Sequence, residues 1–185
     1  NDNRNTGYEK EYEPEQQKDA KSYKAEYRWE FGGGQSNDRE LELTWEEARS
    51  QTAEGDVHLA AHMTVPIRHA VAYTKVQVNS NLEQAIRLLV DVREKTSQKI
   101  WLNGKIVADL TIQQNELGGT IEERRAGGPS RTKGVKVSLR KGTNQLLIKT
   151  ATFGGRWWMR LRIMDERNKR MAQGVTLVTP KPKVE

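Results

Sequence analysis

The sequence has 185 residues, of which 35% are hydrophobic, 15 are glycine and none is cysteine. This length fits one domain of ordinary size with a tail, and the lack of cysteine excludes disulfide bonds, thiolate metal ligands and cysteine nucleophiles. No run of 18 apolar residues occurs, so no membrane-spanning segment is predicted. The chain begins at Asn1 rather than at methionine, and we therefore expect a processed form or a fragment.

The first 24 residues contain almost no aliphatic side chains. Such a segment cannot bury enough apolar surface to offset the entropy of ordering it, which predicts a flexible polar arm or linker over residues 1–24. The arm carries Tyr8, Tyr12 and Tyr23, and a tyrosine supplies a large amphipathic contact area at low entropy cost. The arm is therefore either a disordered spacer or a segment that orders against other protein subunits.

From about residue 25 onward the pattern is that of short strands. Apolar residues occupy every second position at 86–92 and at 135–139, which gives each strand one buried face. Asn103 and Gly104 lie between apolar runs and predict a tight hairpin, because both tolerate the positive φ of a type I′ turn. A short helix-like piece begins at Thr44. Further strands are expected at 57–65, 71–78, 99–102, 105–110, 144–151, 157–164 and 175–178.

Many short strands without alternating helices favour an all-β fold. We expect one antiparallel β-sandwich or jelly roll over residues 25–178, followed by a C-terminal tail at 179–185. Polar turns are expected at 141–144 and 165–170. The segment 113–134 is too rich in glycine for a central strand, which predicts a long loop that is either functional or mobile.

Three stretches of the chain resemble the galactose-binding-like jelly-roll modules found beside hydrolases in secreted bacterial proteins. They are a hairpin in IWLNGKIV (100–107), a lysine-glycine turn in VSLRKGTNQLLIKTA (137–151), and a tryptophan-bearing strand with a polar turn in GRWWMRLRIMDERNKRM (155–171). The resemblance covers roughly residues 25–178. It implies a non-catalytic carbohydrate-binding or structural role, and a secreted, extracellular or periplasmic location.

The sequence predicts no catalytic or metal-binding constellation. His58, His62 and His69 lack the glutamate of an H-E-x-x-H zinc motif, and adjacent carboxylates on a strand point apart rather than converging. The glycine-rich pieces at 32–34 and 126–128 lack the flanking residues of a phosphate-binding loop. We therefore expect neither an enzyme nor a bound cofactor.

The strand at 157–164 carries the candidate binding site. Its alternation groups Trp157 with the core residues and places Trp158, Arg160 and Arg162 on the opposite face. A tryptophan beside two arginines can stack on a sugar ring and bind a carboxylate or sulfate through two hydrogen bonds. The alternative is that Trp158 packs under a loop, covered by the arginines.

Basic charge is concentrated in one part of the chain. Residues 124–170 carry 14 arginine or lysine side chains and two acidic ones, and the net charge of the whole chain is +6. An acidic polysaccharide is therefore a candidate partner, and a solvated basic face is the alternative. Nucleic acid is less favoured, because base stacking needs several exposed rings on one sheet. Two functions remain open: a carbohydrate-binding module, or a structural subunit that assembles through its arm and basic face.

Overall fold

A computed structural model describes most of the chain, namely residues 7–17, 20–31, 35–50, 52, 55–62, 70–93, 96–110, 130–152, 157–167 and 170–178. Only the backbone is described at 26–31, 35–38, 92–93 and 130–131. The chain divides into two compact units. One consists of Glu9–Ala48, and the other of Asn1–Tyr8 together with Arg49–Glu185.

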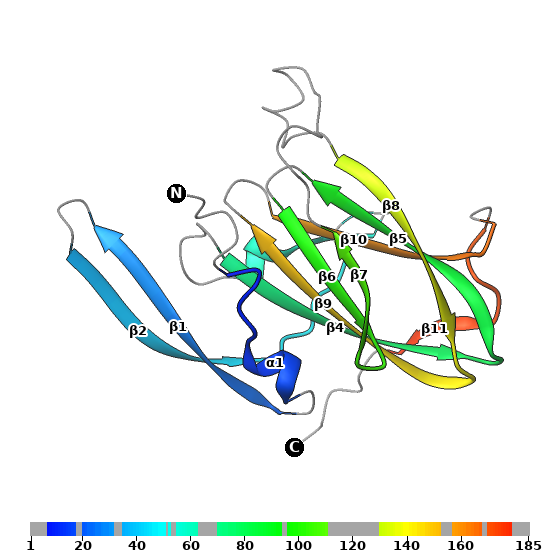
Figure 1. The fold of residues 1–185 in the computed structure, drawn as a ribbon, viewed down its shortest axis with the longest axis horizontal. Coiled ribbons are helices and arrows are strands. Elements are labelled where there is room, and N and C mark those ends of the chain that lie inside the picture. Colours follow the sequence, from blue (N-terminus) through cyan, green and yellow to red (C-terminus); the bar gives the residue numbers. More distant parts are fainter. Residues whose placement is uncertain are drawn as a thin grey trace. The chain divides into compact units, whose positions relative to one another are not determined.

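The larger unit is built from two antiparallel sheets with the strand orders β3-β10-β5-β8 and β11-β4-β9-β6-β7 (Figure 1). The first contains β3 (Asp56–His58), β5 (Gln84–Arg93), β8 (Ser130–Leu139) and β10 (Trp158–Asp165). The second contains β4 (Ala70–Ser80), β6 (Thr96–Leu102), β7 (Lys105–Leu110), β9 (Gly142–Thr152) and β11 (Val175–Val178). The predicted all-β antiparallel sandwich of jelly-roll type is confirmed.

The hydrophobic core lies between the two sheets. Ile86, Leu88 and Val90 on β5 and Leu146 and Ile148 on β9 are all fully buried within one apolar cluster. These are the alternate positions at which each sequence pattern places apolar residues, so the period of two corresponds to the inner faces of the strands. Burial of this apolar area is the main favourable contribution to folding of the sandwich.

One predicted strand of the sandwich is shorter than expected. The sequence pattern predicts a strand over 57–65, but β3 ends at His58 and a 3-10 helix, η1, follows over Leu59–His62. Leu59 packs in the core from this helix. A turn of helix can place an apolar side chain inward as a strand does, so the apolar pattern alone does not separate the two. Residues 63–69 lie outside the described part of the chain.

The smaller unit is a two-stranded ribbon preceded by one helical turn. The turn is α1 (Glu13–Gln16), and β1 (Ser22–Phe31) pairs with β2 (Gln35–Thr44) in antiparallel register. Neither strand is among those predicted, although apolar and aromatic residues occupy every second position of β1 from Tyr23 to Phe31. The helix-like piece predicted from Thr44 is wrong, because residues 45–50 form no helix or strand.

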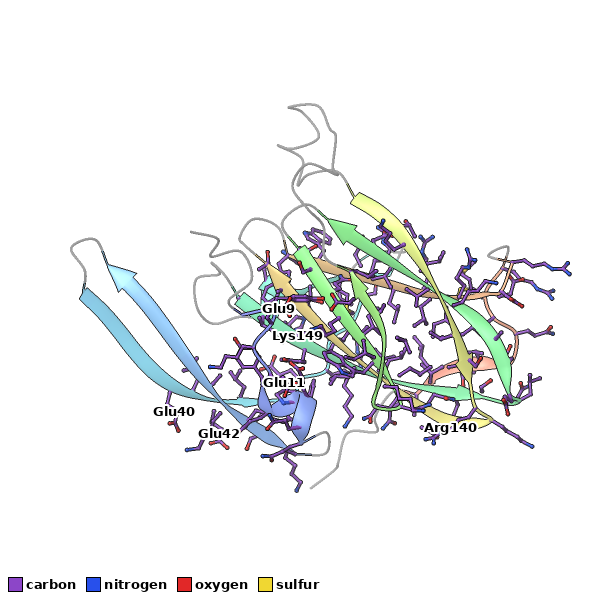
Figure 2. All side chains as sticks on the ribbon, in the orientation of Figure 1. Glu9, Glu11, Glu40, Glu42, Arg140 and Lys149 are labelled. Carbon is purple, nitrogen blue, oxygen red and sulfur yellow. The ribbon has the colours of Figure 1, made fainter. Side chains whose placement is uncertain are left out.

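Side-chain contacts hold the base of the ribbon together. The rings of Tyr23 and Trp45 meet edge to face with centroids 5.6 Å apart, and the Trp45 indole donates a hydrogen bond to the Tyr23 hydroxyl at 3.2 Å. The Lys24 ammonium donates to Glu40 Oε1 at 2.7 Å across the two strands. This hydrogen bond and the charge of Glu40 raise the pKa of Lys24 above its ordinary value. Figure 2 labels Glu40 beside Glu42 on β2.

Tyr8 belongs to the predicted arm, but it is packed into the larger unit and is only 1% exposed. Its hydroxyl donates a hydrogen bond to Asp109 on β7. The ammonium groups of Lys99 and Lys149 lie 4.9 and 5.9 Å from the centre of its ring, within the range of cation–π attraction. Lys149, labelled in Figure 2, is itself almost fully buried. The five-stranded sheet therefore binds this one residue of the arm closely.

The predicted Asn-Gly hairpin is confirmed and is joined to a second turn by asparagine side chains. Asn103 and Gly104 have φ values of 51° and 84°, as a type I′ turn requires. The Asn103 side-chain nitrogen Nδ2 donates to Asn144 Oδ1 at 3.0 Å, and this oxygen also accepts from the Arg140 backbone amide. The Asn144 amide nitrogen donates to the carbonyls of Arg140 and Gly142. Asn144, which is fully buried, thereby uses every donor and acceptor of its side chain.

Replacing Asn144 with alanine is expected to destabilise the sandwich by about 3 kcal/mol, since it removes a fully buried side chain and four hydrogen bonds, three of them to backbone groups of Arg140 and Gly142. The measurement is the free energy of unfolding from chemical denaturation. Gln145→Ala on the same strand is the matched control, with an expected change below about 0.5 kcal/mol. Equal stability of both variants would show that the side-chain network contributes nothing.

Candidate functional site

The two faces of β10 have different environments. Trp157, which directly precedes the strand, is 0% exposed, and Met159 and Ile163 are also buried in the core. Trp158, Arg160 and Arg162 lie between these residues in sequence and are partly exposed. The alternation predicted from the sequence is therefore present, and the three candidate residues share the outer face of the four-stranded sheet.

A row of polar side chains crosses all four strands of this sheet at the level of Arg160. The Arg160 guanidinium forms two hydrogen bonds with the Asp56 carboxylate on β3, at 2.8 and 2.7 Å. On its other side, Arg160 Nη1 lies 3.3 Å from Asp91 Oδ2 on β5. The Thr132 hydroxyl of β8 donates to Asp91 Oδ1 at 2.6 Å. The row thus runs in the order β3, β10, β5 and β8.

Both carboxylates of the row are nearly inaccessible to water, with exposures of 5% for Asp56 and 7% for Asp91. Buried carboxylates are tolerated only when cations and hydrogen-bond donors compensate them, and Arg160 supplies most of that compensation. Its guanidinium is consequently fixed in orientation. A carboxylate of a ligand would compete with two internal carboxylates for Arg160, so this residue is better suited to holding the row in place than to binding an anion.

Trp158 lies beside the row, two residues before Arg160 on β10 and opposite His58 of β3 in the strand register. The two rings stack with centroids 4.7 Å apart and an angle of 25° between their planes. His58 is thus the stacking partner of the candidate tryptophan. The pair forms an aromatic surface next to the Asp56–Arg160 ion pair, with planar rings and planar charged groups side by side.

The other end of the face is basic. Arg162 Nη2 is 3.7 Å from Asp91, and the Arg162 side chain is 39% exposed. Arg87 lies across Gly134, where a Cβ would stand 3.1 Å from its side chain, so a glycine in mid-strand makes room for it. Neither Arg162 Nε nor Arg87 Nε has a hydrogen-bond partner among the described residues. The Lys136 ammonium, by contrast, is bound by Glu166 at 3.1 Å.

Several predicted features fall outside the described part of the chain, namely His69, the glycine-rich pieces at 32–34 and 126–128, positions 113–129 of the long loop, and the tail at 179–185. Among the described residues, no group of three or more histidine, cysteine, aspartate or glutamate side chains is arranged to hold a metal ion. Within the same residues, no helix has the length and apolar character needed to cross a bilayer.

The sequence predicts the three candidate residues of β10 but not the other residues that form the outer face of the four-stranded sheet. Asp91 had a signal, because it is the one acidic side chain of β5 and interrupts the apolar run from Leu88 to Val92. Asp56 and His58 had none, since their place beside β10 depends on pairing between segments about 100 residues apart. The binding role of Trp158, Arg160 and Arg162 stays a prediction.

Comparisons with known proteins assign no family to this chain. No family model and no curated protein matches this chain. One solved structure, described as a family 35 carbohydrate binding module from an environmental isolate, is similar with a TM-score of 0.45 and 13% sequence identity. The match covers 73% of this chain and 88% of that one. A likeness this distant transfers no ligand and no residue role to this chain.

The two neighbouring tryptophans should respond differently to truncation. Trp157→Ala is expected to lower the free energy of unfolding by about 3–5 kcal/mol, as the loss of a large core side chain does. Trp158→Ala should cost far less, because its ring lies on the outer face. Thermal or denaturant unfolding of the two variants measures the difference. Equal destabilisation would mean that both rings are structural and that the outer face offers no aromatic surface.

Proposed function

We propose that this chain is a non-catalytic polysaccharide-binding module of a secreted protein, and that the outer face of the four-stranded sheet is its binding surface. The observation that carries the proposal is the Trp158–His58 stack beside the fixed Arg160 row. Aromatic rings stack on the apolar face of a sugar, and a partly exposed guanidinium group beside them can donate hydrogen bonds to its hydroxyls. Such a surface binds without any need for catalytic groups.

The preference for an acidic polysaccharide rests on Arg162 and Arg87. Both side chains are partly exposed, and the Arg162 guanidinium stands 3.7 Å from Asp91, farther than that of Arg160. A carboxylate or sulfate of the ligand could bind their exposed guanidinium groups through charge-assisted hydrogen bonds. The concentration of basic charge at residues 124–170 would further attract a polyanion.

Binding to polygalacturonate and to neutral galactan, each at low and at high salt, tests the proposal. We expect Trp158→Ala to weaken binding to both polymers, because it removes the stacking surface. Arg162→Gln should weaken binding to the acidic polymer by about tenfold at low salt and by much less at high salt, where charges are screened. Arg160 is a poor probe, because its removal leaves two buried carboxylates unpaired.

Lys105→Gln is the matched control for Arg162→Gln, since it removes one positive charge from an exposed position on β7 of the other sheet. It should leave both affinities unchanged. Failure of the unmodified chain to bind either polymer, or equal weakening by Lys105→Gln and Arg162→Gln, would contradict a specific site on this face.

A second candidate function is that of a structural subunit that assembles through its arm and basic face. Two observations favour it. The Glu9–Ala48 unit has twelve acidic and six basic side chains, a net charge of −6, whereas the rest of the chain has a net charge of +12. Opposite charges on two units favour contact between copies. In addition, the five-stranded sheet binds Tyr8 of the arm in a close-fitting environment, which an arm from another copy could also enter.

Light scattering on the full chain, on Tyr8→Ala and on a variant that lacks residues 1–8 tests assembly, since this deletion leaves α1 and β1 intact. We expect the full chain to form oligomers at low salt that dissociate as salt rises, and both variants to assemble less. A full chain that stays monomeric at low salt and high protein concentration would rule this function out. Oligomers of equal size from all three proteins would show that the arm plays no part.

A further inference from the structure

A pocket of about 500 Å³ opens at the end of the five-stranded sheet where β4, β9 and β11 meet. The end of β4 and the turn after it contribute Asn79 and Asn81, and the start of β9 contributes Gly142 next to Lys141. Thr176 of β11 completes the wall opposite Asn79 in the strand register. Arg140, labelled in Figure 2, directly precedes Lys141 in the turn between β8 and β9. The pocket is not part of the Trp158 face, which belongs to the other sheet.

Two glycines with positive φ line this pocket. Gly142 has a φ of 91°, and a Cβ there would have no atom within 4 Å, so the space beside it is empty. Gly174 has a φ of 70°, and a Cβ there would lie 2.2 Å from Asn81 Oδ1. The Asn81 amide therefore lies directly against the glycine backbone. Any larger residue at position 174 would displace it.

Hydrogen bonds hold the wall while leaving polar groups available. The Thr143 hydroxyl donates to Asn79 Oδ1 at 2.8 Å, and the Asn81 backbone amide donates to the Gly174 carbonyl at 3.0 Å. The Asn79 amide nitrogen, the Asn81 side-chain amide and the Lys141 ammonium form no hydrogen bond or ion pair with any described residue. A fixed wall with unused donors and acceptors is the arrangement that a polar ligand requires.

We infer that this pocket is a second binding site, specific for a hydroxyl-rich ligand that carries one negative charge, such as a uronic acid residue. The inference deepens the proposed function and rests on it. Side-chain amides pair with neighbouring hydroxyls, since each offers both donors and an acceptor. Lys141 supplies one mobile positive charge for a carboxylate. Among the described residues that line the pocket there is no carboxylate, so none of them repels an anion.

NMR titration of the isotopically labelled full chain with trigalacturonic acid tests this inference. The backbone amide signals of Gly142 and Gly174 report on the pocket, and the indole signal of Trp158 reports on the other face. We expect both glycine signals to shift with trigalacturonic acid and to shift less with neutral galactotriose. Lys141→Gln should raise the dissociation constant at the glycine signals by about tenfold, whereas the control Lys105→Gln should not.

The two reporters separate this inference from the proposed function. Glycine shifts that persist in Trp158→Ala would support an independent site in the pocket. A response of Trp158 alone, with unmoved glycine signals at millimolar ligand, would overturn the pocket and leave the proposed function intact. A response of the glycines alone would support the pocket and count against the Trp158 face. Equal weakening by Lys141→Gln and Lys105→Gln would overturn the pocket as a specific site.

Discussion

The position of the Arg160 guanidinium between Asp56 and Asp91 determines how the side chains on the outer face of the four-stranded sheet are arranged. Each carboxylate is nearly buried, and each lies on a different strand, so neither could be there without the cation between them. The row of polar side chains runs across the sheet, perpendicular to its strands, and Thr132 continues it to β8. It sets the side chains of this face at fixed spacings. A ligand that binds here would meet a prearranged surface rather than flexible arginines.

Much of the sandwich could be predicted from local sequence, and the reason is visible in particular strands. At Ile86, Leu88 and Val90 the apolar alternation is unbroken, and all three side chains are fully buried. Asn103-Gly104 identified a hairpin because a backbone with positive φ at two successive residues admits few residue types. β1 and β2 were not predicted. β1 alternates apolar and charged residues from Tyr23 to Phe31, but the predicted boundary of the polar arm at residue 24 divides this pattern. β2 is mostly charged and polar, and its alternation is limited to Leu41 and Leu43.

The candidate site could be predicted only in part, because one strand specifies one line of side chains. The alternation at Trp157–Arg162 separates buried from outward positions without any knowledge of the neighbouring strands. What surrounds those positions depends on register between distant segments, which places Asp56 and His58 next to β10. The sequence therefore suggested two arginines available to an acidic ligand. The structure shows that Arg160 is already bound by carboxylates of its own chain.

The central place of β9 has a consequence for how the chain reaches its fold. β9 pairs with β4 on one side and with β6 on the other, although about 40 residues or more separate it in sequence from both. Until β9 has been synthesised, β4 and β6 each lack their shared neighbour and have an unpaired strand edge. Such edges can pair with other chains. Closing the sheet also requires contacts between distant segments, which form slowly. These two strand edges therefore need protection from other chains until β9 is available to pair with them.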